Sequence, residues 1–112
     1  METQALSGLA LEWAVQKLEI ERKQANLIRV NIWILKSHDE GKSLGGFTTN
    51  WSMGGPIIDR EGILFHGQPG DYQAWVPLKT TSISGPTHLI AAMRCYVRSK
   101  LGDTVELPDA LN

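Results

Sequence analysis

The stretch that decides the fold is residues 85–97, which reads GPTHLIAAMRCYV. Proline is favoured in the first turn of a helix, and a side-chain oxygen of Ser84 or Thr87 can cap the free amides there. Gly102 suits the residue after the last turn, and the apolar side chains between these ends recur at helical spacing, namely Leu89, Ile90, Met93, Val97 and Leu101. The stretch therefore predicts an amphipathic helix with well-marked ends.

Toward the N-terminus, the pattern changes to that of short strands. Residues 62–66 and 72–78 are rich in β-favouring types, and residues 67–71 (GQPGD) between them have the composition of a hairpin loop. We also expect a short strand at residues 47–51, followed by a turn at residues 53–56 (MGGP). These segments predict a small antiparallel sheet.

The first third of the chain predicts one further helix and one further strand. Apolar residues recur at helical spacing over residues 6–23, with Ser7 as the expected N-cap and Thr3 as its competitor. Residues 27–35 alternate with period two, so their β-branched side chains should cover the core while Arg29, Asn31 and Trp33 face a wetter environment. Residues 37–46 read as an exposed loop, and residues 105–112 as an extended tail. We therefore expect one α+β domain, residues 1–112, with the N-terminal and C-terminal helices packed on one face of the sheet.

Composition excludes several classes of protein. The chain has 112 residues, enough for one core, and its 11 Lys and Arg against 12 Asp and Glu give a net charge of −1. We therefore expect neither strong nucleic-acid binding nor attachment to a membrane. A single cysteine, Cys95, and an N-terminus without a basic leader favour a reducing cytoplasm.

Three segments together resemble one known family. They are residues 6–15 (LSGLALEWAV), residues 49–62 (TNWSMGGPIIDREG) and residues 85–97. In sequence and in order they resemble the NinX-like family of small phage proteins, a domain of unknown function, with a departure at His88, where we expect proline. The resemblance implies phage or prophage origin and an accessory role in the cytoplasm of an infected bacterium. It implies no reaction, so any chemistry must be inferred from the side chains.

Common catalytic and metal-binding patterns are weak in this chain. Residues 41–43 (GKS) resemble the end of a phosphate-binding P-loop, but Lys36 stands where that motif requires glycine. His38, His66 and His88 are far apart in sequence, and Cys95 lies among apolar helix residues, so we expect solvent histidines, a buried thiol, no metal and no cofactor. In a strand, Asp59 and Glu61 would share a face, which suggests an acid–base pair. The alternative is that they belong simply to a charged turn.

The strongest candidate site lies around the paired glycines. Adjacent glycines let backbone amides approach an anion, an indole can stack on a base, an amide side chain can read polar edges, and an arginine fork matches phosphate. The alternative is a tight turn with a tryptophan in the core. The expected ligand-binding residues are Asn50, Trp51, Gly54, Gly55 and Arg60, with Arg94 as a further phosphate partner. Arg94 and Arg98 are one turn apart on a helix, where a solvated face is the usual explanation and a phosphate or acidic partner the alternative.

Four tryptophans, Trp13, Trp33, Trp51 and Trp75, are many for a small domain to bury. We therefore expect a second subunit, forming a homo-oligomer, or a ligand to cover one or more of them.

Three hypotheses for the function follow. The first is a non-catalytic protein that sequesters a nucleotide-type signal, such as a cyclic oligonucleotide or an ADP-ribose derivative, and so counters host antiviral defence. The second is a module that docks on a host or phage protein and inhibits it. The third is a small metal-dependent hydrolase or nuclease using Asp59 and Glu61.

Overall fold

A computed structural model describes residues 1–22 and 46–107 of the chain. In order, these residues form a short 3-10 turn, η1 (Thr3–Ala5), then helix α1 (Gly8–Arg22), helix α3 (Trp51–Glu61), strands β1 (Leu64–Gln68), β2 (Asp71–Trp75) and β3 (Ile83–Gly85), and helix α4 (His88–Leu101). The expected strand at residues 27–35, with Trp33, and most of the loop at 37–46 lie outside the described residues.

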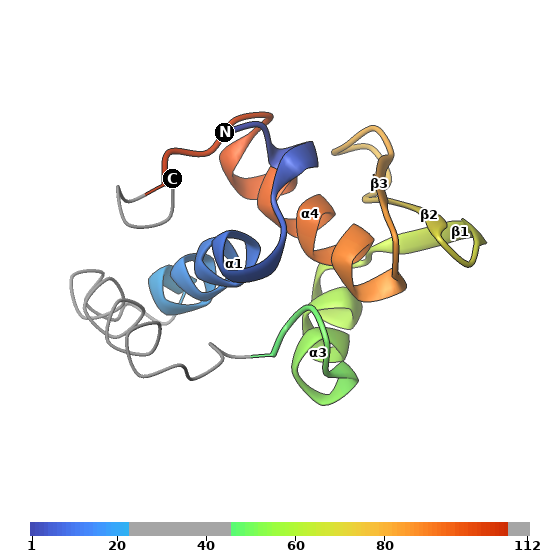
Figure 1. Cartoon of the computed structure of the whole chain (residues 1–112), viewed down its shortest axis with the longest axis horizontal. Helices are drawn as coiled ribbons and strands as arrows, with labels where there is room; N and C mark the ends of the chain where they lie inside the picture. The colour runs from blue at the N-terminus through green and yellow to red at the C-terminus, as the bar shows by residue number, and fades with distance from the viewer. Residues whose placement is uncertain (23–45, 108–112) are drawn as a thin grey trace.

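Helix α4 is the centre of the molecule. It contacts α1, α3, η1 and all three strands, and Figure 1 shows it running between α1 and the sheet. Its ends are those that the sequence predicts: the Thr87 hydroxyl accepts the Ile90 amide at 3.1 Å, and Gly102 follows the last turn with a positive φ of 88°. The predicted α+β fold is therefore confirmed, with α4 lying directly on the sheet and α1 and α3 packed against α4.

The sheet is antiparallel in the order β1-β2-β3. Gln68 pairs with Asp71, so Pro69 and Gly70 form the whole connection of the predicted hairpin. Strand β3 lies close to α4 because Gly85 has no side chain: a Cβ there would stand 2.5 Å from the Ala91 nitrogen. The hairpin thereby sits beside the first turn of α4.

The prediction for residues 47–56 is wrong. Residues 47–49 form a turn instead of a strand, and the expected turn at 53–56 lies inside α3. The Asn50 carboxamide oxygen accepts the Ser52 amide at 2.9 Å and starts the helix, while Gly62 ends it in the left-handed region. Pro56 has no N–H, so α3 lacks the hydrogen bond from residue 56 to the Ser52 carbonyl. That carbonyl lies in the first turn of the helix, where water can solvate it.

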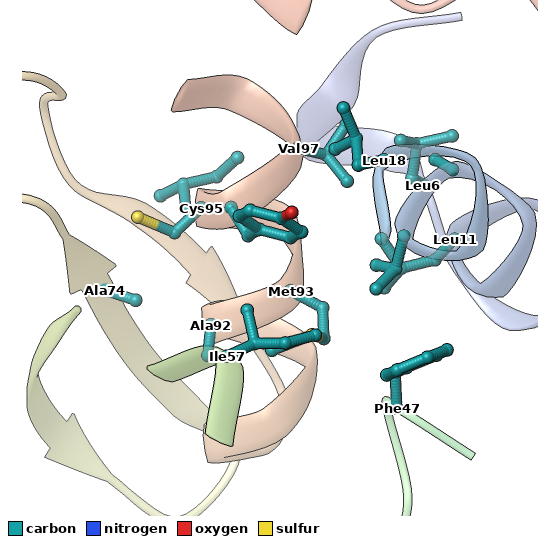
Figure 2. Close-up of a cluster of buried hydrophobic side chains, with 14 of the residues drawn as sticks. Leu6, Leu11, Leu18, Phe47, Ile57, Ala74, Ala92, Met93, Cys95 and Val97 are labelled. Carbon is teal, nitrogen blue, oxygen red and sulfur yellow. The ribbon is translucent and has the colours of Figure 1, made fainter. Parts of the chain in front are cut away.

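The core forms on both sides of α4. Figure 2 shows Met93 and Val97 projecting toward α1, where Leu11 and Leu18 lie, and Cys95 projecting toward the strands. Leu6 and Leu11 lie just before and just after the start of α1, and both are fully buried. This is the arrangement expected for a helix that begins after Ser7. Thr3 caps no helix; its hydroxyl donates to the Gly102 carbonyl at 2.6 Å and ties the N-terminal segment to the end of α4.

Candidate functional site

An open groove of about 550 Å³ lies where the first turns of α3 and α4 meet the β1-β2 hairpin. Its walls come from three separate parts of the chain: the turn and first residue of α3, the hairpin loop with the start of β2, and the start of α4. The lining residues are Thr48, Thr49, Trp51, Pro69, Gly70, Tyr72, Pro86, Thr87, His88, Leu89 and Ile90. The groove is thus walled mainly by aromatic, aliphatic, proline and threonine side chains.

An aromatic cluster forms the wall of the groove, with His88 at its centre. The imidazole stacks on the Tyr72 ring, with centroids 3.8 Å apart and planes inclined by 30°. The Phe65 ring meets it edge to face at 5.4 Å, and the Trp51 indole lies 6.0 Å away, tilted by 55°. Trp51 is 54% exposed, so a large part of an indole face remains open to a planar ligand.

The N-termini of two helices border this aromatic wall. Trp51 is the first residue of α3 and His88 the first of α4, and both helices have side-chain caps, from Asn50 and Thr87. The first amides of a helix have no partner within it and carry partial positive charge. A negatively charged group in the groove would therefore lie in a favourable field.

A buried carboxylate from α1 holds the turn beside the groove. Glu12 accepts the backbone amides of Gly46, Phe47 and Thr48 at 2.9–3.2 Å, and the Thr48 hydroxyl at 2.6 Å. Successive backbone amides aimed at one point are the pattern of an anion-binding nest. Here the anion is the protein's own side chain, and its role is to fix the turn that leads into α3.

Of the residues expected to bind a ligand, Trp51 lines the groove and the other five do not. Asn50 stands next to it as the cap of α3. Gly54 is buried inside the helix, and its amide donates to the Asn50 carbonyl at 3.0 Å. Gly55 is also helical, so the paired glycines do not form an open cradle of amides.

Arg60 is bound within the protein. Both of its terminal nitrogens donate to the Glu19 carboxylate at 3.1 Å, and its Nε donates to Glu61 at 2.9 Å. The Tyr96 hydroxyl accepts from Arg60 at 3.1 Å and donates to Glu19 at 3.2 Å. The cluster joins α1, α3 and α4.

The charges in this cluster shift the pKa values of its members. Burial alone would raise the pKa of Glu19, but the hydrogen bonds from Arg60 and Arg22 outweigh it and hold that pKa below its usual value. Burial likewise opposes the charge on Arg60, yet its bonds to Glu19 and Glu61 raise its pKa. Burial and the nearby Glu19 charge raise the pKa of Tyr96. Arg60 thus remains charged as part of a structural cluster.

Arg94 also has partners inside the fold. Its Nε donates to the Leu6 carbonyl at 2.8 Å and one terminal nitrogen to the Ser84 carbonyl at 2.9 Å. Burial lowers the pKa of this guanidinium. The side chain connects the N-terminal segment to β3 and stands outside the groove lining.

Asp59 and Glu61 do not share a face, as a strand would have required. They lie two positions apart on a helix, where side chains point in different directions. Glu61 binds Arg60 and, at 3.0 Å, Lys100. Within residues 1–22 and 46–107, no three His, Cys, Asp or Glu side chains are grouped so that they could hold a metal ion.

Sequence reasoning missed most of the groove. Tyr72, Thr87 and His88 belong to segments that only the tertiary structure brings beside Trp51. The one signal available was the departure from the expected proline at His88, the residue that proves to be central to the aromatic cluster.

The comparisons with known proteins agree with the resemblance noted from the sequence. The family model described as bacteriophage P22, NinX matches residues 2–100. No curated protein matches the chain. In the described part of the chain, no helix is both long and apolar enough to cross a membrane. Since the match covers most of the sequence, including all three segments that line the groove, the chain belongs to the bacteriophage P22 NinX family.

Proposed function

We propose that this phage protein is a non-catalytic binder that sequesters a nucleotide-type signalling molecule in the host cytoplasm and so counters antiviral defence. The observation that carries the proposal is the exposed Trp51 indole at the mouth of a groove of about 550 Å³. Ligand pockets of small molecules commonly have volumes of about 300–1,000 Å³ and aromatic walls. The groove has the size for one nucleotide or for part of a larger one.

The aromatic wall is suited to bind the nucleobase of such a ligand. Every nucleobase has a π-face, and stacking of a base on an aromatic side chain contributes about 1–3 kcal/mol. Trp51 offers the open face, while the stacked Tyr72 and His88 rings form a rigid second wall. The two helix starts described above favour a phosphate at the same place.

A purely binding role fits the chemistry of the lining. A sequestering protein needs contact area and a favourable field for anions, but it needs no general base, nucleophile or metal. Glu61, one of the two carboxylates considered for a hydrolase, is held by Arg60 and Lys100, which suits a structural role.

Thermal melting against cyclic oligonucleotides and ADP-ribose derivatives tests the proposal. A ligand at a hundred times its dissociation constant should stabilise the wild-type protein by about 2.7 kcal/mol. Trp51→Ala should abolish the shift, whereas Leu78→Ala, which removes another exposed apolar side chain outside the groove lining, should keep it. Mass analysis should recover the ligand intact.

The absence of any shift across the panel, or an equal shift in the Trp51→Ala protein, would contradict the proposal. Release of a cleaved product that depends on a divalent metal would favour the hydrolase hypothesis instead.

A second candidate is a docking module, and one observation favours it. Leu78 is wholly exposed and has a positive φ of 67°, an unusual backbone conformation for a leucine. Exposed apolar side chains such as Leu78 and Trp51 are typical of protein interfaces.

We also propose that the protein forms a homo-oligomer, and light scattering after gel filtration tests this. A dimer that Trp51→Ala or Leu78→Ala converts to a monomer would support docking through these side chains. A monomer at high concentration would exclude self-association.

A further inference from the structure

We infer that His88 determines the specificity of the groove by hydrogen bonding to the polar edge of a planar heterocycle. The inference rests on the proposed function, because it takes the groove to be the binding site. It adds that the ligand must carry a ring with donors or acceptors on its edge, as purines and pyrimidines do, and that an apolar ring of the same size is a poorer ligand.

The position of the His88 ring is fixed before any ligand arrives. It is the first residue of α4, the helix that contacts every other element, and it stacks on Tyr72 of β2 at 3.8 Å. Phe65 of β1 holds it from a second direction, edge to face at 5.4 Å. A side chain held by two strands and a helix has little rotational freedom to lose on binding, so its hydrogen bonds can contribute nearly fully to affinity.

The hydrogen-bonding capacity of this ring is not used within the described part of the protein. The two ring nitrogens of His88 can each form a hydrogen bond, and neither has a protein partner among residues 1–22 and 46–107. The nearby cap residue Thr87 already accepts the Ile90 amide. Arg60 and Arg94, the cations expected to recognise a ligand, donate hydrogen bonds to other residues of the fold and do not line the groove.

His88 therefore combines two properties in one side chain. Its ring belongs to the aromatic wall, which any flat molecule can contact, while its nitrogens can hydrogen bond to a bound ligand only where the edge of that ligand carries polar atoms. A site that forms such a bond discriminates against an analogue that lacks the partner, because the polar group is then left unpaired. Trp51 would then supply affinity for planar rings in general, and His88 the preference for a base.

The test compares two ligands that share a phosphate and differ in the ring. Adenosine 5′-monophosphate carries a polar heterocycle, and 1-naphthyl phosphate carries an apolar one. Binding to the full chain is followed by quenching of tryptophan fluorescence, with folding of each variant checked by thermal melting. In the wild type we expect adenosine monophosphate to bind about tenfold more tightly, the effect of about one hydrogen bond.

Two variants of His88 separate its ring from its nitrogens. His88→Phe keeps a flat ring against Tyr72 and removes both nitrogens, so it should lose the tenfold preference while binding 1-naphthyl phosphate as before. His88→Gln keeps a donor and an acceptor without the ring, so it should retain the preference although both ligands bind more weakly.

The outcomes distinguish the two proposals. An equal loss for both ligands in His88→Phe, or an unchanged preference, overturns the role of His88 and leaves the groove as the binding site. A wild-type protein that binds neither ligand overturns the proposed function together with this inference.

Discussion

At the scale of single residues, the two glycines of α3 have different roles. A Cβ on Gly54 would stand 2.5 Å from the Phe47 carbonyl oxygen and 2.6 Å from Leu89 Cδ2, whereas a Cβ on Gly55 would have no closer neighbour than Trp51 Cε3 at 3.9 Å. The first glycine allows α3 to approach the preceding turn and α4. The second has no close neighbour from another part of the chain. Neither role concerns a ligand anion.

This difference gives a matched pair of substitutions. Gly54→Ala should destabilise the protein by about 1–3 kcal/mol, because the backbone of the turn must move to accept the methyl group. Gly55→Ala should change the stability by less than about 1 kcal/mol, since the helix preference of alanine is opposed by the crowding of its Cβ against the ring of Pro56. Urea unfolding measures both, and a tolerated Gly54→Ala would show that the close contact does not exist.

A second prediction at this scale concerns pH. The pKa values of Glu19 and Glu61 lie below their usual value of 4.5. A carboxyl whose pKa is lowered by folding contributes stability above its unfolded pKa and loses it as the pH falls through the folded one. Stability should therefore decline below about pH 4.5, and Glu19→Gln should be less stable near neutrality but less sensitive to acid. An unchanged acid profile in Glu19→Gln would contradict this role.

At the scale of elements, two carboxylates of α1 help to position α3. The Glu12 carboxylate binds three successive amides of the turn that leads into α3, and the Glu19 carboxylate binds Arg60 near its end. One face of α1 thus fixes both ends of α3, and with them the position of Trp51 in the groove.

Glu12→Gln tests this arrangement. A carboxamide has only one oxygen to accept the four bonds that Glu12 now accepts, so we expect a loss of about 1–3 kcal/mol in stability. Glu106→Gln, at an exposed position, is the control and should have almost no effect. If ligand binding to the groove is measured, Glu12→Gln should weaken it while His88 and Trp51 remain unchanged in sequence.

The elements also show how much of the fold the sequence could predict. Helices α1 and α4 and the hairpin were predicted because their periodicity, caps and turn residues are local signals. Helix α3 was missed, because Gly54, Gly55 and Pro56 signal a turn and the contact that requires Gly54 comes from Phe47 and Leu89. Trp51 was predicted and does line the candidate groove, but Arg60 was assigned to a ligand because its partner Glu19 is 41 positions away in sequence.

At the scale of the whole molecule, every other described helix and strand contacts α4. The α4 residues that face α1 and those that face the sheet belong to one buried cluster, so separation of either side exposes part of that core. Small domains with a single core of this kind usually unfold in one step.

Cys95 offers a probe of that step. The thiol is fully buried in the middle of α4, and burial raises its pKa, so it should not react with a thiol reagent in the native state. Its modification rate should follow the global free energy of unfolding and fall in stabilising conditions. Rapid labelling in the native state would show that α4 opens locally.

The first turn of α4 forms part of the groove, and the rest of that helix contacts the whole described structure. A guest molecule there would bind only the folded arrangement of α3, α4 and the hairpin, so occupancy should stabilise the whole fold and slow amide hydrogen exchange as far away as α1.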